Sequence, residues 1–95
     1  MMTNKYDIVA TSAFRKDIKR LRRQGADMAK LDAVVEKIAN GETLDEKYRD
    51  HPLKNNRKGF RDCHIEPDWV LIYKLDGDVL VLTLTRTGSH AELHL

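Results

Sequence analysis

The spacing of the apolar residues changes from a helical period to a strand-like period part-way along the chain. In the first half, apolar side chains recur every three or four residues, which places them on one face of an α-helix. They are Phe14, Ile18 and Leu21 in one segment and Met28, Leu31, Val34, Val35 and Ile38 in the next. After Gly59 the period becomes two, because Cys63 and Ile65 alternate with polar residues. The sequence therefore predicts an α+β fold in which two helices precede most of a sheet.

Both predicted helices carry start and stop signals. Thr11-Ser12 offers an N-cap oxygen for the first helix, and Gly25 ends it because glycine tolerates the left-handed conformation found there. Asp27 caps the second helix, which stops at Asn40-Gly41. Since the connection is very short, we expect the two helices to form an antiparallel hairpin.

Four strands are expected beside this helical hairpin. Residues 6–10 predict a first or edge strand, residues 60–66 and 69–75 predict two more, and residues 79–85 predict the last one. Asp76-Gly77 is a strong signal for a two-residue hairpin turn, and Arg86 continues the phase of the leucines in the last strand. Residues 42–58 are polar and predict a long loop with one helical turn near residues 44–48. The result is a single domain over residues 1–95 of order β-α-α-β-β-β, with the helical hairpin on a mostly antiparallel four-stranded sheet.

Positive charge is concentrated in the N-terminal part of the chain. Residues 1–40 hold nine Lys or Arg and five Asp or Glu, whereas residues 41–95 hold eight and ten, although the whole chain has a net charge of only +2. Six cations flank the apolar stripe of the first helix. A solvated helix face explains such a cluster, and so does a surface that binds nucleic-acid phosphates. The six are Arg15, Lys16, Lys19, Arg20, Arg22 and Arg23.

Cysteine usage and hydropathy indicate in which cellular compartment the protein is expected. Cys63 is the only cysteine, so no internal disulfide can form, which fits a reducing cytosol. No segment is apolar and long enough for a signal peptide or a membrane span. We therefore expect a cytoplasmic protein that does not bind membranes.

Several side chains that can transfer protons or hold a phosphate surround the predicted sheet. Strand alternation places Asp62 and His64 on the same face, opposite Cys63 and Ile65. The other members come from the long loop, from the turn after residue 66 and from the end of the last strand. Trp69 follows that turn and lies within reach of the same end of the sheet. The full set is His51, Asp62, His64, Asp68, Arg86 and His90.

Each of these residues also has an ordinary structural interpretation. A polar pair such as Asp62 and His64 suits the solvent face of a sheet, and a lone His51 in a loop is usually a surface residue. Arg86 can hold a phosphate through its guanidinium, or it can form an ion pair with Asp62 or Asp68.

RNA cleavage is one chemistry that this set can perform without a metal. The ribose 2′-hydroxyl is the nucleophile, so the protein must remove its proton, stabilise a phosphorane and protonate the departing 5′-oxygen. Histidine suits both proton transfers because its ordinary pKa lies near neutrality, and arginine can stabilise the phosphorane. His90 and His94 are four residues apart, as in some zinc sites, but the chain has no paired cysteines and no His-Glu-x-x-His run. We therefore expect no metal and no cofactor.

Three segments together resemble the YafQ branch of the RelE/ParE toxins, and the resemblance extends over essentially the whole chain. They are Asp50-His51-Pro52-Leu53, then Phe60-Arg61-Asp62-Cys63-His64-Ile65-Glu66-Pro67-Asp68-Trp69-Val70-Leu71-Ile72-Tyr73, then Arg86-Thr87-Gly88-Ser89-His90-Ala91-Glu92-Leu93. The resemblance implies a RelE-like fold and a type II toxin that cleaves mRNA in the ribosomal A site, leaving a 2′,3′-cyclic phosphate. It also implies a cognate antitoxin, whose DNA-binding N-terminal part connects the pair to operator DNA.

The family's functional positions fall on the six residues of the set listed above. By this resemblance His64 together with Asp68 is expected to form the general base, His90 the general acid, and Arg86 the phosphate contact, although base and acid could be exchanged. His51 would have a supporting role and Trp69 would contact substrate. This chain has His94 where relatives commonly have an aromatic residue, so His94 is expected to stack less well on a base. The six cations of the first helix would bind ribosomal RNA.

Two other functions share the expected fold. A ParE-like toxin acts by binding a partner protein such as gyrase and performs no catalysis, and a decayed toxin serves only as a co-repressor. Fold alone does not decide between them, so the site must. Convergent titratable groups favour the nuclease.

Overall fold

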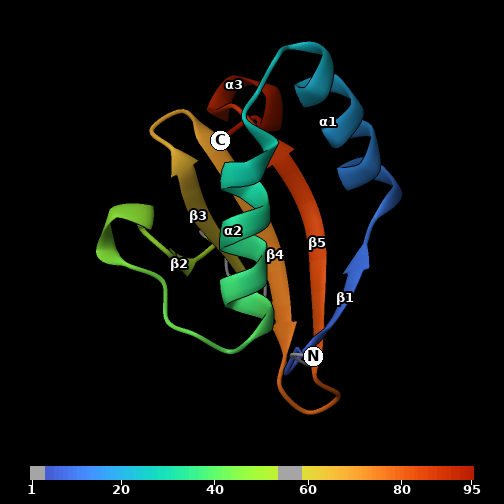
Figure 1. Cartoon of the computed structure of the whole chain (residues 1–95), viewed down its shortest axis with the longest axis vertical. Coiled ribbons are helices and arrows are strands. Elements are labelled where there is room, and N and C mark those ends of the chain that lie inside the picture. The colour runs from blue at the N-terminus through green and yellow to red at the C-terminus, as the bar shows by residue number, and fades with distance from the viewer. Residues whose placement is uncertain (1–3, 54–58) are drawn as a thin grey trace.

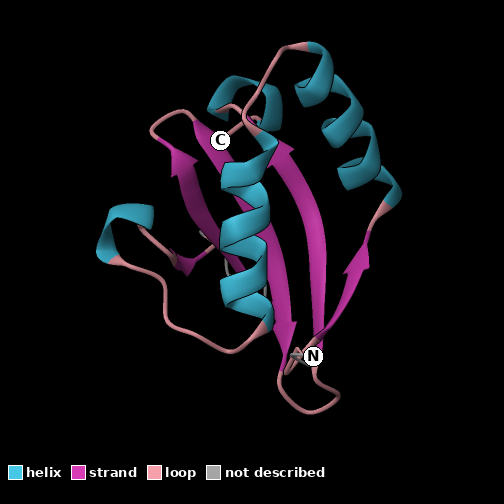
Figure 2. Ribbon diagram, viewed as in Figure 1, coloured by secondary structure: helices cyan, strands magenta, loops and turns pink. Residues whose placement is uncertain are grey.

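The computed structural model describes residues 4–53 and 59–95, and it shows two long helices on a curved sheet (Figure 1). The first half contains β1 (Asp7–Ala10), α1 (Ser12–Arg23), α2 (Met28–Ala39) and the 3-10 turn η1 (Glu46–Tyr48). The second half contains β2 (His51–Pro52), β3 (Phe60–Glu66), β4 (Trp69–Asp76), β5 (Val81–Gly88) and the short α3 (His90–Leu93). Figure 2 colours the helices and the strands separately and shows that the two long helices lie on the sheet. The predicted α+β class and helix positions are confirmed.

The sheet has the strand order β1-β5-β4-β3-β2. β1 runs parallel to β5, and the other neighbours are antiparallel. The prediction of four strands misses β2, whose two residues pair with Arg61 and Asp62. β2 lies inside the predicted long loop and is too short to show a period. Residues 54–58 of that loop lie outside the described part of the chain.

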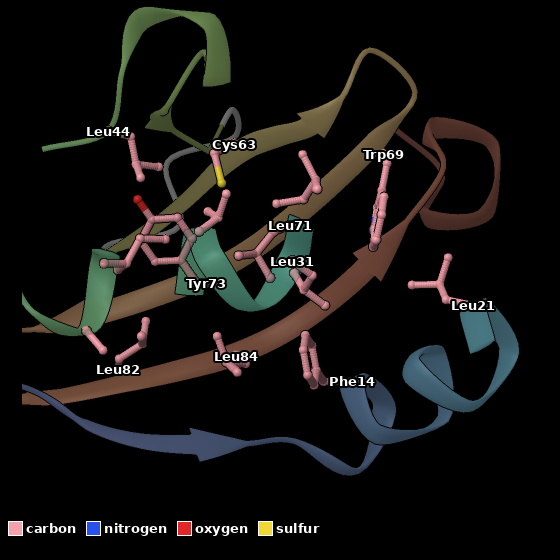
Figure 3. Packing of buried hydrophobic residues seen from close by; sticks show 14 residues of the cluster. Phe14, Leu21, Leu31, Leu44, Cys63, Trp69, Leu71, Tyr73, Leu82 and Leu84 are labelled. Carbon is pink, nitrogen blue, oxygen red and sulfur yellow. The ribbon is translucent and has the colours of Figure 1, made fainter. Parts of the chain in front are cut away.

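The core lies between the sheet and the two helices (Figure 3). α2 contributes Leu31, Val34 and Ile38, and it packs on β3, whereas α1 packs on β5. The helices run in opposite directions (Figure 1), and their caps are those expected. Thr11 accepts a hydrogen bond from the Phe14 N–H at 3.0 Å, and Asp27 accepts one from Ala29 at 3.2 Å.

The β4–β5 connection differs from the expected two-residue turn. Asp76 pairs with Val81, so the loop comprises residues 77–80, and the last strand is Val81–Gly88 rather than residues 79–85. The Asp76 carboxylate accepts hydrogen bonds from the backbone of residues 78 and 79, and this local turn outweighs the Asp-Gly signal. Leu80 in this loop adopts a left-handed conformation with a φ of 55°.

A β-bulge at Thr85 changes the face to which Arg86 belongs. Leu84 pairs with Tyr73, but the adjacent residue of β4, Ile72, pairs with Arg86, so Thr85 is the extra residue. The prediction that Arg86 keeps the phase of the leucines is therefore wrong. The bulge sends Arg86 to the outer face of the sheet, away from the core, and it turns Thr87 toward the core.

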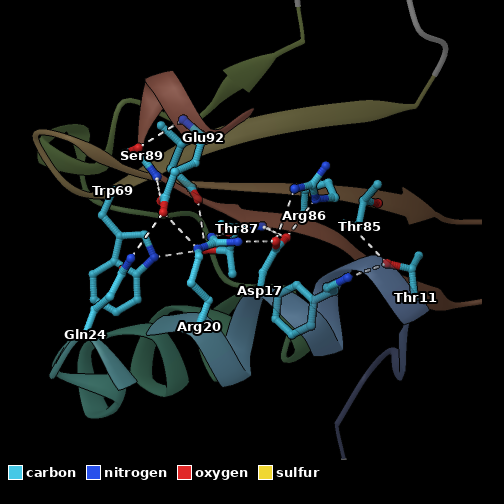
Figure 4. A network of polar contacts seen from close by, with 12 residues as sticks. Thr11, Asp17, Arg20, Gln24, Trp69, Thr85, Arg86, Thr87, Ser89 and Glu92 are labelled. Carbon is cyan, nitrogen blue, oxygen red and sulfur yellow. Dashed lines mark hydrogen bonds and ion pairs between the residues drawn. The ribbon is translucent and has the colours of Figure 1, made fainter. Parts of the chain in front are cut away.

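A buried carboxylate on α1 completes the edge of β5 beyond the end of β1. Asp17 is 2% exposed, and its Oδ2 accepts a hydrogen bond from the Thr87 N–H at 3.0 Å. Arg86 donates to it from Nε at 2.7 Å and from Nη2 at 3.1 Å, and Arg20 donates from Nη1 at 2.8 Å (Figure 4). Burial by itself raises the pKa of Asp17, but these hydrogen bonds outweigh it and hold the pKa below its usual value.

Arg20 belongs to the same network, which corrects the interpretation of the first helix as presenting six cations to solvent. Its guanidinium also lies 2.8 Å from Glu92 of α3 and donates to the Thr87 carbonyl at 3.0 Å. A Cβ at Gly88 would come within 2.6 Å of this guanidinium, so a side chain there would displace Arg20 from the network. The remaining five cations of α1 are exposed: Arg15, Lys16, Lys19, Arg22 and Arg23. Among residues 4–53 and 59–95, the structure contains no helix that could span a lipid bilayer.

Candidate active site

Two histidines face each other at the end of the sheet where β3 and β5 finish. Nε2 of His64 lies 3.3 Å from Nε2 of His90, and the ring centroids are 5.3 Å apart. His64 comes from the outer face of β3, and His90 is the first residue of α3. The cross-strand pairs of His64 with Val70 and of Val70 with Gly88 place the start of α3 beside this histidine. Residues that are 26 positions apart in the sequence thus share one site.

Asp68 orients His90 rather than His64, which corrects the predicted pairing. Its Oδ1 accepts a hydrogen bond from Nδ1 of His90 at 2.7 Å and another from the His90 backbone N–H at 3.0 Å. Asp68 occupies the tight turn between β3 and β4, and this turn faces the N-terminus of α3. The hydrogen bonds from His90 lower the pKa of Asp68, which is therefore ionised at neutral pH.

The hydrogen bonds assign the protons on this pair of rings. Because Nδ1 of His90 donates to Asp68, Nε2 of neutral His90 carries a lone pair directed at His64. A contact between the two Nε2 atoms requires one proton between them. Burial lowers the pKa of His64, and a positive charge on His90 lowers it further. The lowered pKa disfavours a second proton on the His64 ring.

His51 and Asp62 form a second pair next to these rings. They are cross-strand partners of β2 and β3, and Nε2 of His51 lies 2.7 Å from Oδ1 of Asp62. Asp62 is 8% exposed, and burial raises its pKa even though the charges of His51 and His64 act in the opposite direction. Strand alternation places Asp62 and His64 on the same face, as predicted. That face is less open to solvent than expected, because Val70 and Ile72 on it are also buried.

A buried tyrosine fixes the segment that carries His51. The hydroxyl of Tyr73 donates to Oδ1 of Asp50 at 2.5 Å, and Nε of Arg61 donates to the same oxygen at 3.2 Å. Tyr73 is 1% exposed, and burial together with Asp50 raises its pKa above the ordinary value. The short strand β2 is thus attached to the core, and His51 takes its position from that attachment.

Arg86 reaches the outer face of the sheet, but its guanidinium is engaged by Asp17. The expected alternatives, ion pairs with Asp62 or Asp68, are wrong. Nε and Nη2 of Arg86 bind Asp17, and Nη1 has no hydrogen-bond partner within residues 4–53 and 59–95, so it can bind a further ligand. Asp62, Ile72 and Arg86 are successive cross-strand partners, so Arg86 lies in the row of the sheet that also contains His51.

The two residues expected to contact substrate are placed very differently. Trp69 is 5% exposed and donates from Nε1 to the Thr87 hydroxyl at 2.9 Å, so its ring belongs to the core and is not available for stacking on a base. His94 is exposed and adopts a left-handed conformation with φ 59° at the end of α3. Cys63 is fully buried, and burial raises the pKa of its thiol to about 12, so it is not a nucleophile.

A pocket of about 750 Å³ opens beside His64, and sequence reasoning did not anticipate it. It lies along the part of β3 beyond β2, between the N-terminus of α2 and the η1 turn. Its lining includes Lys30, Lys47, Tyr48, Arg49 and His64. The signal in the sequence was the run of Lys, Tyr and Arg immediately before the Asp50-His51 segment.

Comparisons with known proteins identify the family of this chain. A family model described as "Bacterial toxin of type II toxin-antitoxin system, YafQ" matches residues 6–95. The chain belongs to the YafQ toxin family. It is 43% identical over 88 residues to the mRNA interferase toxin YafQ of Escherichia coli strain B / BL21-DE3, covering 92% of this chain and 94% of that protein. The resemblance seen in the sequence is confirmed.

Solved structures of YafQ toxins have the same fold. A chain of the E. coli DinJ-YafQ toxin-antitoxin complex is 41% identical, with a TM-score of 0.88 over 94% of this chain and 97% of that one. A metal-bound toxin from Helicobacter pylori is 42% identical, also with a TM-score of 0.88, over 93% of this chain and 98% of that one. In the part of this YafQ-family chain that the structure describes, no three His, Cys, Asp or Glu side chains are grouped to hold a metal ion.

Proposed function

We propose that this chain is a ribosome-dependent endoribonuclease that cleaves mRNA in the A site and so stops translation in the cytoplasm. The names of its relatives, mRNA interferase toxins, support the activity class. The observation that carries the mechanism is the 3.3 Å contact between Nε2 of His64 and Nε2 of His90, with Asp68 behind His90. These groups need no metal to move protons in either direction.

His64 serves as the general base in this proposal. Its pKa is lowered by burial and by His90, so the ring is neutral at physiological pH and can accept a proton. It takes the proton of the ribose 2′-hydroxyl, and the 2′-oxygen attacks the adjacent phosphorus. Asp62 lies on the same face, and its charge favours the imidazolium that forms on His64.

His90 serves as the general acid. Its Nδ1 stays bound to Asp68, so a protonated ring presents Nε2–H to the departing 5′-oxygen. The bond between phosphorus and the 5′-oxygen breaks, the 5′-oxygen receives the proton, and a 2′,3′-cyclic phosphate remains. After the products leave, the proton on His64 can return to His90 across the short distance between the two Nε2 atoms.

Arg86 and His51 support the phosphorane in this mechanism. The free Nη1 of Arg86 can donate to a phosphate oxygen while Asp17 holds the rest of the guanidinium in place. His51 and Asp62 adjust the charge beside His64. His94 contributes a weak contact to a base from the end of α3.

The non-catalytic ParE-like alternative, with a partner such as gyrase, is disfavoured. A toxin that only binds a partner protein has no use for an oriented Asp68–His90–His64 series.

The second partner in this proposal is a cognate antitoxin. The E. coli relative forms a complex with DinJ, which supports a comparable small protein that covers the toxin. By the family resemblance, this antitoxin has a DNA-binding N-terminal part, and operator DNA is contacted only through it.

We expect cleavage on programmed ribosomes to continue in the presence of phenanthroline, with magnesium retained for the ribosome. No step of the mechanism uses a transition metal, so the chelator has no target. The fragments should carry a 2′,3′-cyclic phosphate at one end and a 5′-hydroxyl at the other. Direct labelling by polynucleotide kinase detects the 5′-hydroxyl. Loss of cutting with the chelator, restored by added zinc or copper, would contradict the metal-free mechanism.

The exposed cations of α1 are proposed to bind ribosomal RNA, and Arg22→Glu tests this. The variant should bind ribosomes several-fold more weakly, and the slope of log Kd against log salt should fall by about 1, since one phosphate contact is lost. Lys37→Glu is a matched control, because Lys37 is an exposed basic residue in the last turn of α2 and Arg22 is an exposed basic residue in the last turn of α1. Equal ribosome binding by the two variants would show that α1 is an ordinary solvated surface and does not bind ribosomal RNA.

A further inference from the structure

The pocket beside His64 contains a cation whose role the mechanism above does not include. Arg49 lines the pocket together with His64, and its positive charge lowers the pKa of that histidine. Its side chain forms no ion pair within residues 4–53 and 59–95, whereas the neighbouring Arg61 is bound to Asp50 and Lys30 is bound to Glu66. Arg49 is also exposed, so its guanidinium is available to a ligand.

The backbone holds Arg49 in place despite its exposure. Its φ of 48° and ψ of 45° lie in the left-handed region, where a non-glycine residue is uncommon. The Arg49 N–H donates to the Glu46 carbonyl at 3.0 Å, and the next residue, Asp50, is tied to the buried Tyr73. These contacts oblige the chain to turn at Arg49 and present this side chain at the mouth of the pocket.

An aromatic ring stands next to this cation. Tyr48 lines the pocket and is half-buried, and Nζ of Lys47 lies 5.1 Å from the centre of its ring. Proteins bind single-stranded RNA with such groups: positively charged side chains contact the phosphates, and an aromatic ring stacks on a base. A volume of about 750 Å³ is large enough for a nucleotide and lies within the range of small-ligand sites.

We propose that this pocket binds the nucleotide adjoining the scissile phosphate, with Arg49 on its phosphate and Tyr48 against its base. The inference rests on the proposed function, because it takes His64 as the group next to the reacting 2′-hydroxyl. It assigns Arg49 the ground-state phosphate contact that Arg86, bound to Asp17, supplies only in part. Arg49 is thus a substrate-binding residue, not a proton-transfer group.

The direct test uses a single-stranded trinucleotide with 2′-deoxyribose at every position, which binds without being cleaved. Arg49→Gln should raise its Kd about tenfold, the loss expected for a charge-assisted hydrogen bond, and Arg49→Lys should recover part of that loss. Tyr48→Leu should raise the Kd by a similar factor through lost stacking. Lys37→Gln removes a charge from the exposed end of α2 and should leave the Kd within about twofold.

Cleavage on programmed ribosomes separates binding from chemistry. Arg49→Gln should raise KM about tenfold and change kcat less than about threefold. The midpoint of His64 in an NMR titration should move upward, because the positive charge that lowers its pKa is gone. An unchanged KM would contradict the binding role even if that midpoint moves, because the charge of Arg49 acts on His64 whatever Arg49 binds.

The possible failures of the two proposals are distinguishable. If Arg49→Gln binds the trinucleotide and cleaves mRNA like the unaltered protein, while His64→Ala does not cleave, the pocket inference is overturned and the nuclease stands. Absence of trinucleotide binding by the unaltered protein overturns it as well. If Arg49→Gln weakens only antitoxin binding, the pocket is a protein-docking site. If the unaltered protein binds the trinucleotide through Arg49 but cuts no mRNA, the pocket stands and the nuclease fails.

Discussion

His90→Ala is expected to slow single-turnover cleavage of ribosome-bound mRNA by about 10²–10⁴-fold, and His64→Ala by a similar factor. Each variant removes one proton-transfer group, and such groups contribute roughly this much. The double variant should be little worse than either single one, because the two rings act as a unit around one shared proton. Quenched time courses on programmed ribosomes measure all three rates.

The dependence of the rate on pH distinguishes the base from the acid. His64 must be neutral to accept a proton, and its pKa is lowered in the fold. The cleavage rate of the unaltered protein should therefore stay constant as pH decreases to the ordinary histidine pKa near 6.5, and it should fall only below that pH.

Asp68→Asn should slow cleavage less than His90→Ala does, since it removes only the orientation of the His90 ring. His94→Ala, which removes only a weak contact to a base, should lower the rate far less than His64→Ala or His90→Ala does. If His64→Ala and His90→Ala cut at the unaltered rate, the site lies elsewhere.

Asp17→Asn is expected to lower the free energy of unfolding by about 3–5 kcal/mol, the usual cost of breaking a buried ion pair by removing one partner. The amide cannot satisfy Arg20 and Arg86 together, and it places two N–H donors where hydrogen-bond donors already converge. A loss of this size is a large part of the stability of a small domain. Denaturation with urea, followed by circular dichroism, measures it.

The acid dependence of stability provides a second measurement of the same effect. The pKa of Asp17 is lowered in the folded state, so its stabilisation is present above the ordinary value of 3.8 and disappears as pH falls through the folded value. The unaltered protein and Asp17→Asn should therefore differ at neutral pH and converge in acid. Asp32→Asn, on the exposed face of α2, should change stability by less than about 0.5 kcal/mol at any pH. A neutral Asp17→Asn would show that the network contributes no net stability.

Periodicity and capping predicted the helices and the long strands because those elements bury a continuous stripe or face. The caps at Thr11 and Asp27 and the shared face of Asp62 and His64 followed from local rules. These rules depend only on neighbours within a few residues.

Features that depend on a single extra residue or on a distant partner could not be predicted in this way. The bulge at Thr85 moved Arg86 to the other face, and only the register with β4 reveals it. The partner of Asp17 is 69 positions away, so an acid among the cations of α1 looked like a surface residue. The family resemblance pairs Asp68 with His64, whereas the tight β3–β4 turn directs Asp68 at His90.

The parallel pairing of β1 with β5 joins the two ends of the chain, since Asp7 is in register with Val81 and Ala10 with Leu84. During synthesis, β1 has no partner until β5 has been made. The proposed catalytic residues extend from His51 to His90, so the proposed site is complete only once β5 and the start of α3 have been made. By the proposed mechanism, a chain interrupted before His90 lacks the general acid and cannot cleave mRNA.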